Sequence, residues 1–424
     1  MTVIIEEVAE EEEVTQTQRA AAKTRQAIAG VPSPRDGSAA AAPVTHRSGI
    51  VDLTDGRGYL RTAGYLRSPG DIPLTAGQVR QYGLRKGDQI DVTVTGDRNG
   101  GTSGGAAGKR TANGQRPREA GRIDVTAVNG LSPDEARERR NFDDLTPIYP
   151  NQRFRLEDGN PSPAARIIDL VSPIGKGQRG LIVAPPKAGK TTILRTIAHA
   201  IAVAYPDVHL MLVLVGERPE EVTDLRRSIR GEVISSTFDQ SPADHVLAAE
   251  LAIERAKRLA ELGLDVVVML DSLTRLGRAY NMAAPGNGRT LSGGVAVSAL
   301  QPPRQFLGAA RCLEEGGSLT ILSTVLVDTG SLMDNVLFEE FKGTGNMELR
   351  LRRDLAEKRL FPAIDAVPSG TRREDLLLDP AEHAAVISLR RALAALDPQH
   401  ALELLLEKTT GPNEKFLRQI RDSQ

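Results

Sequence analysis

The second half of the chain contains four runs of consecutive apolar residues, each followed by a longer stretch in which apolar residues recur at helical spacing. The runs are residues 181–183, 210–215, 266–270 and 319–326. Because consecutive apolar residues bury both faces of a strand, such runs are typical of a parallel sheet with helices on both sides. The pattern predicts a doubly wound, mostly parallel α/β domain over residues 166–424.

The preceding part of the chain has a different pattern, in which short β-prone runs are separated by Gly, Pro and Asp turns. Runs at residues 49–53, 89–94 and 123–128 predict a small β-barrel over residues 48–130. Residues 96–122 interrupt it with eight glycines, six Lys or Arg and two acids, a composition typical of a flexible basic loop. Residues 131–165 are polar and proline-containing, and we interpret them as a linker.

The two ends of the chain are also distinct in composition. Residues 1–47 are rich in Glu, Ala, Gln and Thr and predict a mostly disordered tail. Beyond Asp379, two amphipathic helices are expected, each opened by an Asp-Pro pair. We interpret both as helices that pack against the rest of the domain, since Val386, Leu389, Leu393 and Leu396 would share one face of the first.

Composition limits the class of protein. The chain of 424 residues is 40% hydrophobic and 26% charged, which fits a globular protein with a sizeable core. A net charge of −1 means that any basic surface must be local. Cys312 is the single cysteine, so an intrachain disulfide is excluded. No apolar run approaches the length of a membrane span, and a cytoplasmic location is expected.

The loop after the first apolar run predicts a phosphate-binding site. Ala184 ends the run, and the loop and helix start that follow contain Lys187, Ala188, Gly189, Lys190, Thr191 and Thr192. Backbone N–H groups of such a loop bind phosphates, Lys190 would reach the β- and γ-phosphates of ATP, and the Thr191 hydroxyl would bind Mg²⁺. The first position of the usual pattern is glycine, and here it is Ala184. An ordinary strand-to-helix turn is the alternative.

Two acidic residues complete the candidate ATPase site. Asp271 ends the run at 266–270, where ligands of open α/β sheets bind, and it is the candidate Mg²⁺ partner; a helix cap is the alternative. Glu217 lies just past the run at 210–215 and is the candidate general base. Glu220 and Glu221 are equally acidic, but they follow Pro219 and fit the first turn of a helix better.

Several longer motifs resemble those of the Rho transcription termination factors, in the same order along the chain. They are residues 177–183 leading into the phosphate loop, 217–222, 271–275, 339–347 and 369–372. The resemblance covers residues 48–424 and implies a RecA-like, homohexameric helicase with ATP sites between subunits. It also implies single-stranded RNA as a ligand, 5′-to-3′ translocation, and the RNA polymerase elongation complex as a partner.

The same resemblance assigns further site residues. Arg218 would lie beside the γ-phosphate, Phe361 would stack on adenine, and Arg372 would complete a neighbour's site. Without the family, Phe361 reads as a core residue and Arg372 as a solvated charge. RNA inside the ring would contact Arg289, Thr290, Gly293, Gly294, Gly330 and Ser331, and RNA on the barrel, an OB-fold in this family, would contact Arg57, Tyr59, Arg61 and Asp71.

The chain departs from the family pattern at three RNA positions. Leu332 stands where the family has lysine, and Arg57 and Pro73 stand where aromatic residues are expected. We therefore hypothesise that RNA loading depends more on charge and less on base stacking than in most relatives, with the basic insertion at 96–122 contributing. A solvated spacer is the alternative for the insertion.

Two other classes of protein remain as alternatives to an RNA-stimulated ATPase that terminates transcription. A rotary-synthase-like or protein-export ATPase shares the hexamer and the phosphate loop but needs no RNA-binding barrel. An RNA-binding adaptor with a degenerate ATP site would lack the intact set of Lys190, Glu217, Asp271 and Arg372.

Overall fold

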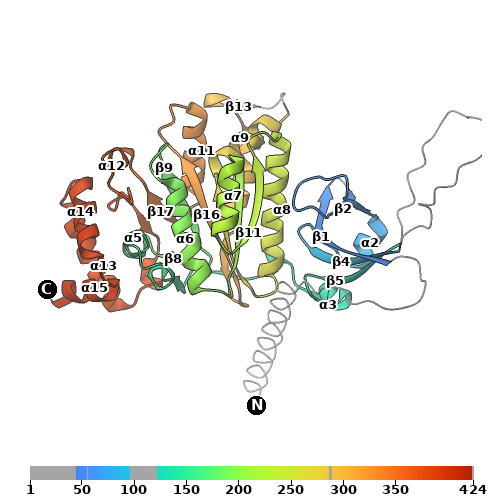
Figure 1. Ribbon diagram of the computed structural model, residues 1–424, viewed down its shortest axis with the longest axis horizontal. Coiled ribbons are helices and arrows are strands. Elements are labelled where there is room, and N and C mark those ends of the chain that lie inside the picture. Colours follow the sequence, from blue (N-terminus) through green and yellow to red (C-terminus); the bar gives the residue numbers. More distant parts are fainter. Residues whose placement is uncertain (1–43, 55, 96–121, 286–288, 423–424) are drawn as a thin grey trace, which may run out of the picture. The chain divides into compact units, whose positions relative to one another are not determined.

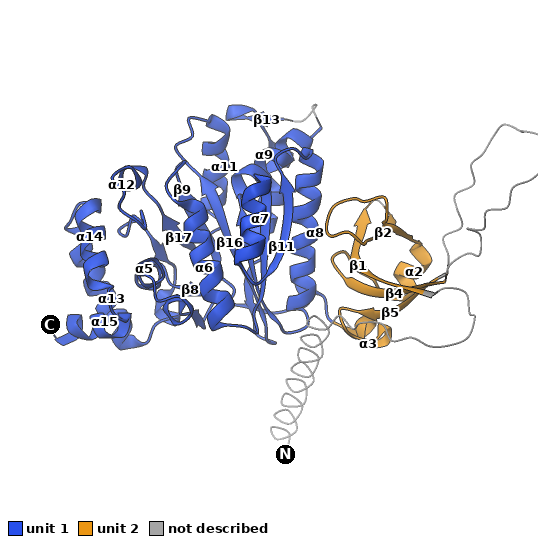
Figure 2. Ribbon diagram, viewed as in Figure 1, with its two compact units in different colours: residues 1–21, 140–424 blue, residues 22–139 orange. Residues whose placement is uncertain are grey.

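The computed structural model describes residues 44–54, 56–95, 122–285 and 289–422, in two compact units that meet in sequence at residues 139 and 140 (Figure 2). The tail at 1–43 and nearly all of the insertion at 96–122 lie outside the described residues, so the predictions for them stay open. No helix among those described is long and apolar enough to cross a membrane.

The N-terminal unit is a five-stranded antiparallel sheet in the order β3-β2-β1-β4-β5. Its strands are β1 (Val44–Thr54), β2 (Arg57–Arg61), β3 (Ile72–Leu74), β4 (Gln89–Thr95) and β5 (Arg122–Val128). The long central strand β1 pairs with β4 through its first half and with β2 through its second, so that Ile50 lies opposite both Gln89 and Arg61. The strand predicted at 123–128 is confirmed as β5, paired with β4.

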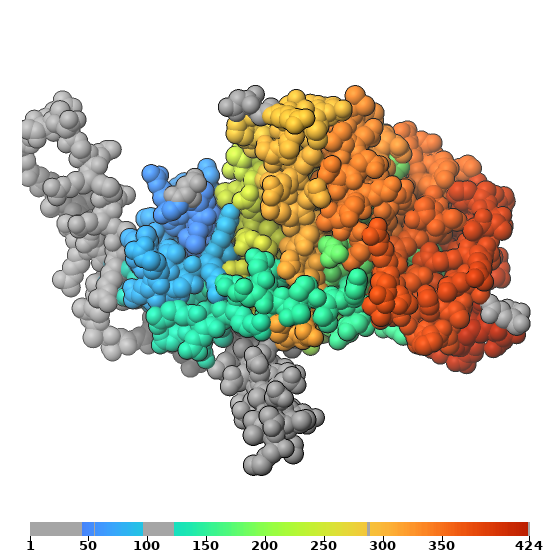
Figure 3. Space-filling view, turned by 180° about the vertical axis from the view of Figure 1, so that it is seen from behind, coloured from blue at the N-terminus to red at the C-terminus, as the bar shows by residue number. Residues whose placement is uncertain are grey.

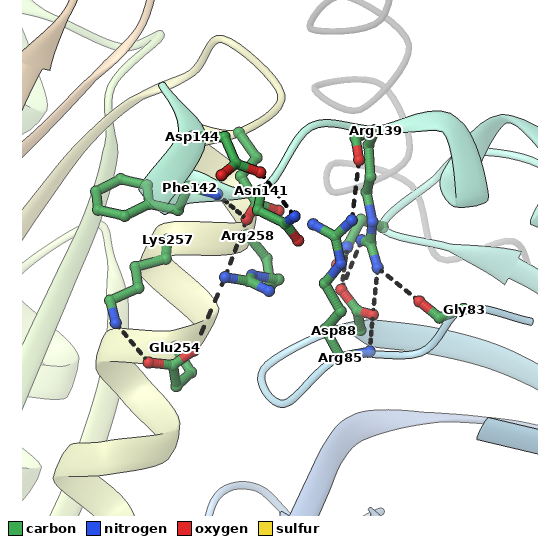
Figure 4. Close-up of polar contacts among 12 residues, drawn as sticks. Gly83, Arg85, Asp88, Arg139, Asn141, Phe142, Asp144, Glu254, Lys257 and Arg258 are labelled. Atoms are coloured by element: carbon green, nitrogen blue, oxygen red, sulfur yellow. Dashed lines mark hydrogen bonds and ion pairs between the residues drawn. The ribbon is translucent and has the colours of Figure 1, made fainter. Parts of the chain in front are cut away.

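Two short helices complete this unit. Both α2 (Ala76–Gln81) and α3 (Pro133–Glu138) begin with capping boxes, in which Thr75 and Ser132 accept from the backbone three residues on. The last residue of the unit, Arg139, ion-pairs with the buried Asp88 at 2.6 Å and donates to the carbonyl of Gly83 (Figure 4). The end of α3 is thereby tied to the loop before β4.

The second unit begins immediately afterwards. The backbone N–H of Phe142 donates to the Glu261 carboxylate at 2.7 Å (Figure 4). The buried Phe142 ring lies 4.6 Å from the Arg311 guanidinium. The stretch 131–165 thus contains regular structure. Besides α3 it includes η1 (Phe142–Asp144), β6 (Pro147–Ile148), β7 (Arg153–Phe154), α4 (Leu156–Gly159) and the start of α5 (Pro163–Val171).

A large, mainly parallel sheet in the order β11-β10-β12-β16-β9-β17-β18 forms the centre of the second unit (Figure 1). The strands are β9 (Arg179–Ala184), β10 (His209–Glu217), β11 (Glu232–Thr237), β12 (Asp265–Asp271), β16 (Ser318–Leu326), β17 (Met347–Arg350) and β18 (Gly370–Thr371). All four predicted strands are confirmed as β9, β10, β12 and β16, and they pair in parallel. The short strands β8 (Ile174–Gly175) and β15 (Arg311–Leu313) pair antiparallel with β7 and β16.

Alternate residues of the central strands enter separate hydrophobic layers. Leu212 and Met269 belong to one cluster with α6 (Lys190–Ala204) and α7 (Pro219–Ser228), whereas the buried Val213 and Val268 lie outside that cluster. Helices α8 (Pro242–Ala260) and α9 (Leu273–Ala283) pack against each other and against the sheet, and none of their residues belongs to the first cluster. The sheet is therefore covered by different helices on its two faces, as the apolar runs predict.

Three helices form the C-terminal end of the unit, seen in red in Figure 3. They are α13 (Pro380–Ala394), α14 (Pro398–Lys408) and α15 (Asn413–Asp422). The first two begin at the predicted Asp-Pro pairs, where Asp379 and Asp397 cap them, and the third was not predicted. The prediction for Leu396 is wrong: this side chain lies beyond the end of α13 and is 39% exposed.

Asp169 is a buried carboxylate away from the ATP site. It lies on α5 and accepts from the backbone N–H groups of Leu156 and Glu157, at 3.1 and 3.0 Å, at the start of α4. Burial raises its pKa to about 7, although these hydrogen bonds act in the opposite direction. The folded protein therefore holds a proton that the unfolded chain releases near pH 4, so the stabilising contribution of this group falls as pH rises towards about 7.

We expect Asp169→Asn to flatten the pH dependence of stability between about pH 4 and 7. Asn cannot ionise, and it offers one acceptor oxygen for two N–H donors, so it should cost about 1–3 kcal/mol at pH 5. The cost of Asp169→Asn should be smaller at pH 7.5, because the wild-type protein must then itself hold an ionised carboxylate in a buried position. Urea unfolding at both pH values measures the effect, with exposed Asp158→Asn as the matched control. An equal cost at both pH values would contradict the assigned pKa.

Candidate functional site

The phosphate loop joins the end of β9 to the start of α6. Gly189 occupies the N-cap position of α6 with φ +92°, a left-handed conformation that favours glycine, and no side chain caps the helix. The first N–H groups of α6, which include those of Thr191 and Thr192, have no partner within the helix. Lys187 is exposed and also has a positive φ, of +67°. The loop therefore presents backbone donors at the start of a helix, as an anion site requires.

Lys190 lies between the two predicted acidic residues. Its Nζ donates to Glu217 Oε1 at 3.1 Å and to Asp271 Oδ1. The acids end the neighbouring strands β10 and β12 and are almost fully buried, with 4% and 1% exposure. Asp271 also accepts from the Thr324 hydroxyl of the next strand, β16, at 2.8 Å. The sheet order thus brings together three predicted residues that lie far apart in sequence.

A second cation reaches Glu217 from α9. Arg275 Nη1 lies 2.8 Å from Glu217 Oε1 and donates to the carbonyl of Gly216. Burial and the nearby Asp271 raise the pKa of Glu217, while Lys190 and Arg275 lower it. A carboxylate with a raised pKa, in a buried site and held by fixed donors, is suited to accept a proton from water.

These residues fit ATP and Mg²⁺. The described residues contain no group of three His, Cys, Asp or Glu side chains that would hold a metal ion by themselves. Mg²⁺ in nucleotide sites is commonly bound by one or two protein oxygens together with phosphate and water, and Asp271 with the Thr191 hydroxyl matches that donor set.

Two residues assigned by the family resemblance lie at the edge of this site. Phe361 is 49% exposed, and its ring lies 3.8 Å from the point where a Cβ on Gly189 would stand. The alternative interpretation of Phe361 as a core residue is therefore wrong. Arg218 occupies the N-cap position of α7 without a side-chain capping hydrogen bond, and its guanidinium lies 3.3 Å from the Glu221 carboxylate. Glu220 and Glu221 lie in the first turn of α7, as predicted.

Arg372 is not near the phosphate loop of its own chain. The backbone N–H of Arg372 donates to the carbonyl of Asn346, and the backbone N–H of Asn346 donates to the carbonyl of Arg179. Arg372 therefore lies beside the first residue of β9. The phosphate loop follows the other end of this strand, and five residues of strand separate the two levels by roughly 16 Å. Arg372 is exposed, and the described residues offer it no ion pair.

The N-terminal unit carries a separate polar pocket of about 680 Å³. It is lined by Thr54, Arg57, Tyr59, Arg61, Arg67, Ser68 and Asp71. Arg61 is buried and neutralised between Asp52 and Asp71, and its guanidinium lies 5.1 Å from the centre of the Tyr59 ring. Arg57 and Arg67 are exposed and have no ion pair among the described residues. The pocket thus offers one aromatic ring and two free cations.

The two loops predicted to contact RNA inside the ring lie against each other. A Cβ on Gly293 would stand 2.8 Å from Met333 N, so only glycine permits this contact. In the first of these loops, Thr290 lies on β13 (Thr290–Leu291). Arg289 and Gly294 are the first and last residues of the part of this loop that the structure describes. Residues 286–288 lie outside the described residues.

The second of these loops is braced by a buried carboxylate. Ser331 caps α11 (Leu332–Lys342), and Gly330 has a positive φ. Asp334 accepts from Thr329 at 2.6 Å and from Arg278 of α9. Leu332, at the position where the family has lysine, is 68% exposed.

The sequence did not single out several residues that complete these sites. Arg67 lies in a polar loop like many surface arginines, and Asp52 alternates with apolar residues on β1. Thr324 lies inside an apolar run, and Arg275 is one of several arginines near Asp271. Arg275 lies one helical turn after Asp271, at the start of α9, and this spacing was the only signal available for it.

The fold and the sites define a RecA-like P-loop ATPase domain joined to an OB-fold RNA-binding domain. Residues 164–371 match the nucleotide-binding domain of the ATP synthase alpha/beta family, and residues 47–134 match the RNA-binding domain of the Rho termination factor. The chain belongs to the transcription termination factor Rho family.

The relatives support this assignment over most of the chain. Transcription termination factor Rho of Streptosporangium roseum is 55% identical over 403 residues, which cover 95% of this chain and 98% of that protein. Those of Streptomyces lividans and Mycobacterium tuberculosis are 56% and 54% identical over 88% of this chain, but the chain spans only 51% and 61% of their length. Among solved structures, a type III secretion ATPase has 25% identity and a TM-score of 0.56, with 66% of this chain and 87% of that chain covered.

The polar pocket of the N-terminal unit leads to a prediction about how RNA affinity depends on salt concentration. We expect Arg57→Gln to lower the slope of log RNA affinity against log salt by about 0.7, the value for one lost phosphate contact on a single strand. Tyr59→Ala should instead weaken binding by about 1–3 kcal/mol with little change of slope, because stacking is only weakly sensitive to salt.

Binding of oligo(C) from low to high salt measures both effects. Arg80→Gln removes an exposed cation that does not line the pocket and serves as the control. Equal slopes for Arg57→Gln and Arg80→Gln would contradict a phosphate contact at Arg57.

Proposed function

We propose that this chain is an ATP-driven, homohexameric translocase that loads onto single-stranded RNA, moves 5′ to 3′ and terminates transcription at the RNA polymerase elongation complex. The observation that carries this proposal is the pairing, in one chain, of an RNA-binding domain with an ATPase domain in which the candidate hydrolytic residues come together. Lys190 contacts both Glu217 and Asp271 beside the phosphate loop.

ATP hydrolysis at this site follows from the residues present. The loop N–H groups and Lys190 bind the phosphates, and Lys190 then leaves Glu217, which keeps Arg275 as its partner. Glu217 is the general base that orients and deprotonates the attacking water. Mg²⁺, when bound by Thr191 and Asp271, would neutralise charge on the β- and γ-phosphates.

Helix α9 supports coupling between RNA and ATP. It begins directly after Asp271, Arg275 contacts Glu217, and Arg278 binds Asp334 at the loop proposed to contact RNA. One rigid helix therefore carries contacts to both sites. A shift of the loop that moves Arg278 would also move Arg275, about one helical turn away.

A protein-export ATPase is the second candidate, because the type III secretion ATPase shares the fold over 66% of this chain. ATP turnover in the presence of poly(C) separates the two. An RNA translocase should be stimulated, whereas an export ATPase should not respond.

We expect Glu217→Gln to retain ATP binding and assembly but to lower poly(C)-stimulated turnover by about 100-fold or more, the scale for loss of a positioned base. Glu220→Gln, at an exposed carboxylate in the first turn of α7, is the matched control and should be near normal. Near-normal turnover in Glu217→Gln would remove this residue from the mechanism.

A second prediction concerns Arg372, which lies too far from its own phosphate loop to act there. An arginine that completes a neighbour's site can contribute about 10³-fold in rate. Mixed rings of Arg372→Ala and Lys190→Ala subunits should regain activity at junctions where an intact loop meets an intact Arg372. If crosslinking proves mixing and the mixed rings hydrolyse ATP no faster than either variant alone, action in trans is refuted.

A further inference from the structure

His245 lies close to the general-base candidate, and the mechanism described so far does not use it. It is on the first turn of α8, and its Nδ1 lies 2.6 Å from the hydroxyl of Ser236, a fully buried residue of β11. The other ring nitrogen faces the end of β10. His245 Nε2 lies 3.9 Å from the point where a Cβ on Gly216 would stand.

The Arg275 side chain, from α9, also lies close to Gly216. Its Cδ and Nη1 lie 3.3 and 3.8 Å from the Cβ position of Gly216. Gly216 has φ +66° and lies at a register shift between β10 and β11. Because this residue has no side chain, Arg275 can cross the strand and reach both Gly216 O and Glu217 Oε1. His245 therefore lies beside the Arg275 side chain where that side chain passes over Gly216.

The Ser236 hydroxyl can either accept from Nδ1–H or donate to Nδ1, and the cation on the other side of the ring decides which arrangement is favourable. When Nδ1–H donates to the Ser236 hydroxyl, Nε2 carries a lone pair beside the Arg275 cation, which is electrostatically favourable. A protonated ring would instead place a second positive charge beside Arg275. Burial and Arg275 lower the pKa of His245, and Asp244 of the same helix and Asp239 after β11 act in the opposite direction. The neutral form is thus the one that suits this position.

We propose that neutral His245, oriented by Ser236, is a positioning residue that holds Arg275 across Gly216 so that Arg275 can aim Glu217 at the attacking water. The inference rests on the proposed role of Glu217 as general base. His245 itself touches neither ATP nor water in this mechanism, and it acts through Arg275.

The test uses the full-length protein with saturating poly(C). His245→Phe keeps the aromatic volume and removes both nitrogens, so kcat should fall about tenfold, the scale of a lost positioning contact, while KM for ATP stays within about twofold. His245→Gln returns an acceptor near the position of Nε2 and should recover much of kcat. His209→Asn is the matched control, because His209 pairs with Glu232 at the opposite end of β10.

A double-mutant cycle with Arg275→Ala identifies the route of the effect. If His245 acts through Arg275, His245→Phe should cause no further loss of kcat in the Arg275→Ala background. A full additional loss there, or a normal kcat for His245→Phe alone, would overturn the proposal. Failure of the general-base mechanism would be recognised separately, by normal turnover in Glu217→Gln.

The pH profile gives an independent readout. Wild-type kcat should fall on the acid side through two groups, His245 and Glu217. His245→Gln should keep only the limb due to Glu217, because its amide does not titrate. An unchanged acid limb in His245→Gln would contradict the requirement for a neutral His245.

Discussion

The central constraint in this molecule is the burial of two carboxylates, Glu217 and Asp271, at one edge of a parallel sheet. Two buried negative charges are tolerated only with cations or donors close by. Lys190 binds both, Arg275 binds Glu217, and the Thr324 hydroxyl binds Asp271. The phosphate loop, the start of α9 and strand β16 are therefore tied to the same pair of carboxylates.

Helix α9 extends this constraint to the loop that follows β16. Its first residues follow Asp271, and its cations reach Glu217 and Asp334 in turn. Asp334 braces the loop that packs against Gly293, so the two loops proposed to contact RNA are held by the same helix whose Arg275 contacts Glu217, the proposed general base. The N-terminal pocket is a different kind of site: Arg61 is already neutralised, which leaves Tyr59, Arg57 and Arg67 to contact a ligand.

Much of the architecture could be predicted from local patterns. The runs that became β9, β10, β12 and β16 are apolar on both faces, and the Asp-Pro pairs start α13 and α14 as expected. Leu396 was misplaced because helical periodicity does not reveal where a helix ends, and α13 stops at Ala394. Arg275 and His245 were missed because arginine and histidine on polar helix turns look the same whether they face solvent or a buried acid.

The sequence by itself determined the strand–loop–helix around Lys190 and the acids at the strand ends, because these depend on residues adjacent in the chain. It also indicated the family, through several long motifs in order. Only the tertiary structure decided that β10, β12 and β16 are neighbours, that Arg372 lies at the far end of β9, and that Gly216 leaves room for Arg275. The physical reason is that strand order and side-chain approach depend on long-range packing and on the pairing of buried charges, which no local pattern specifies.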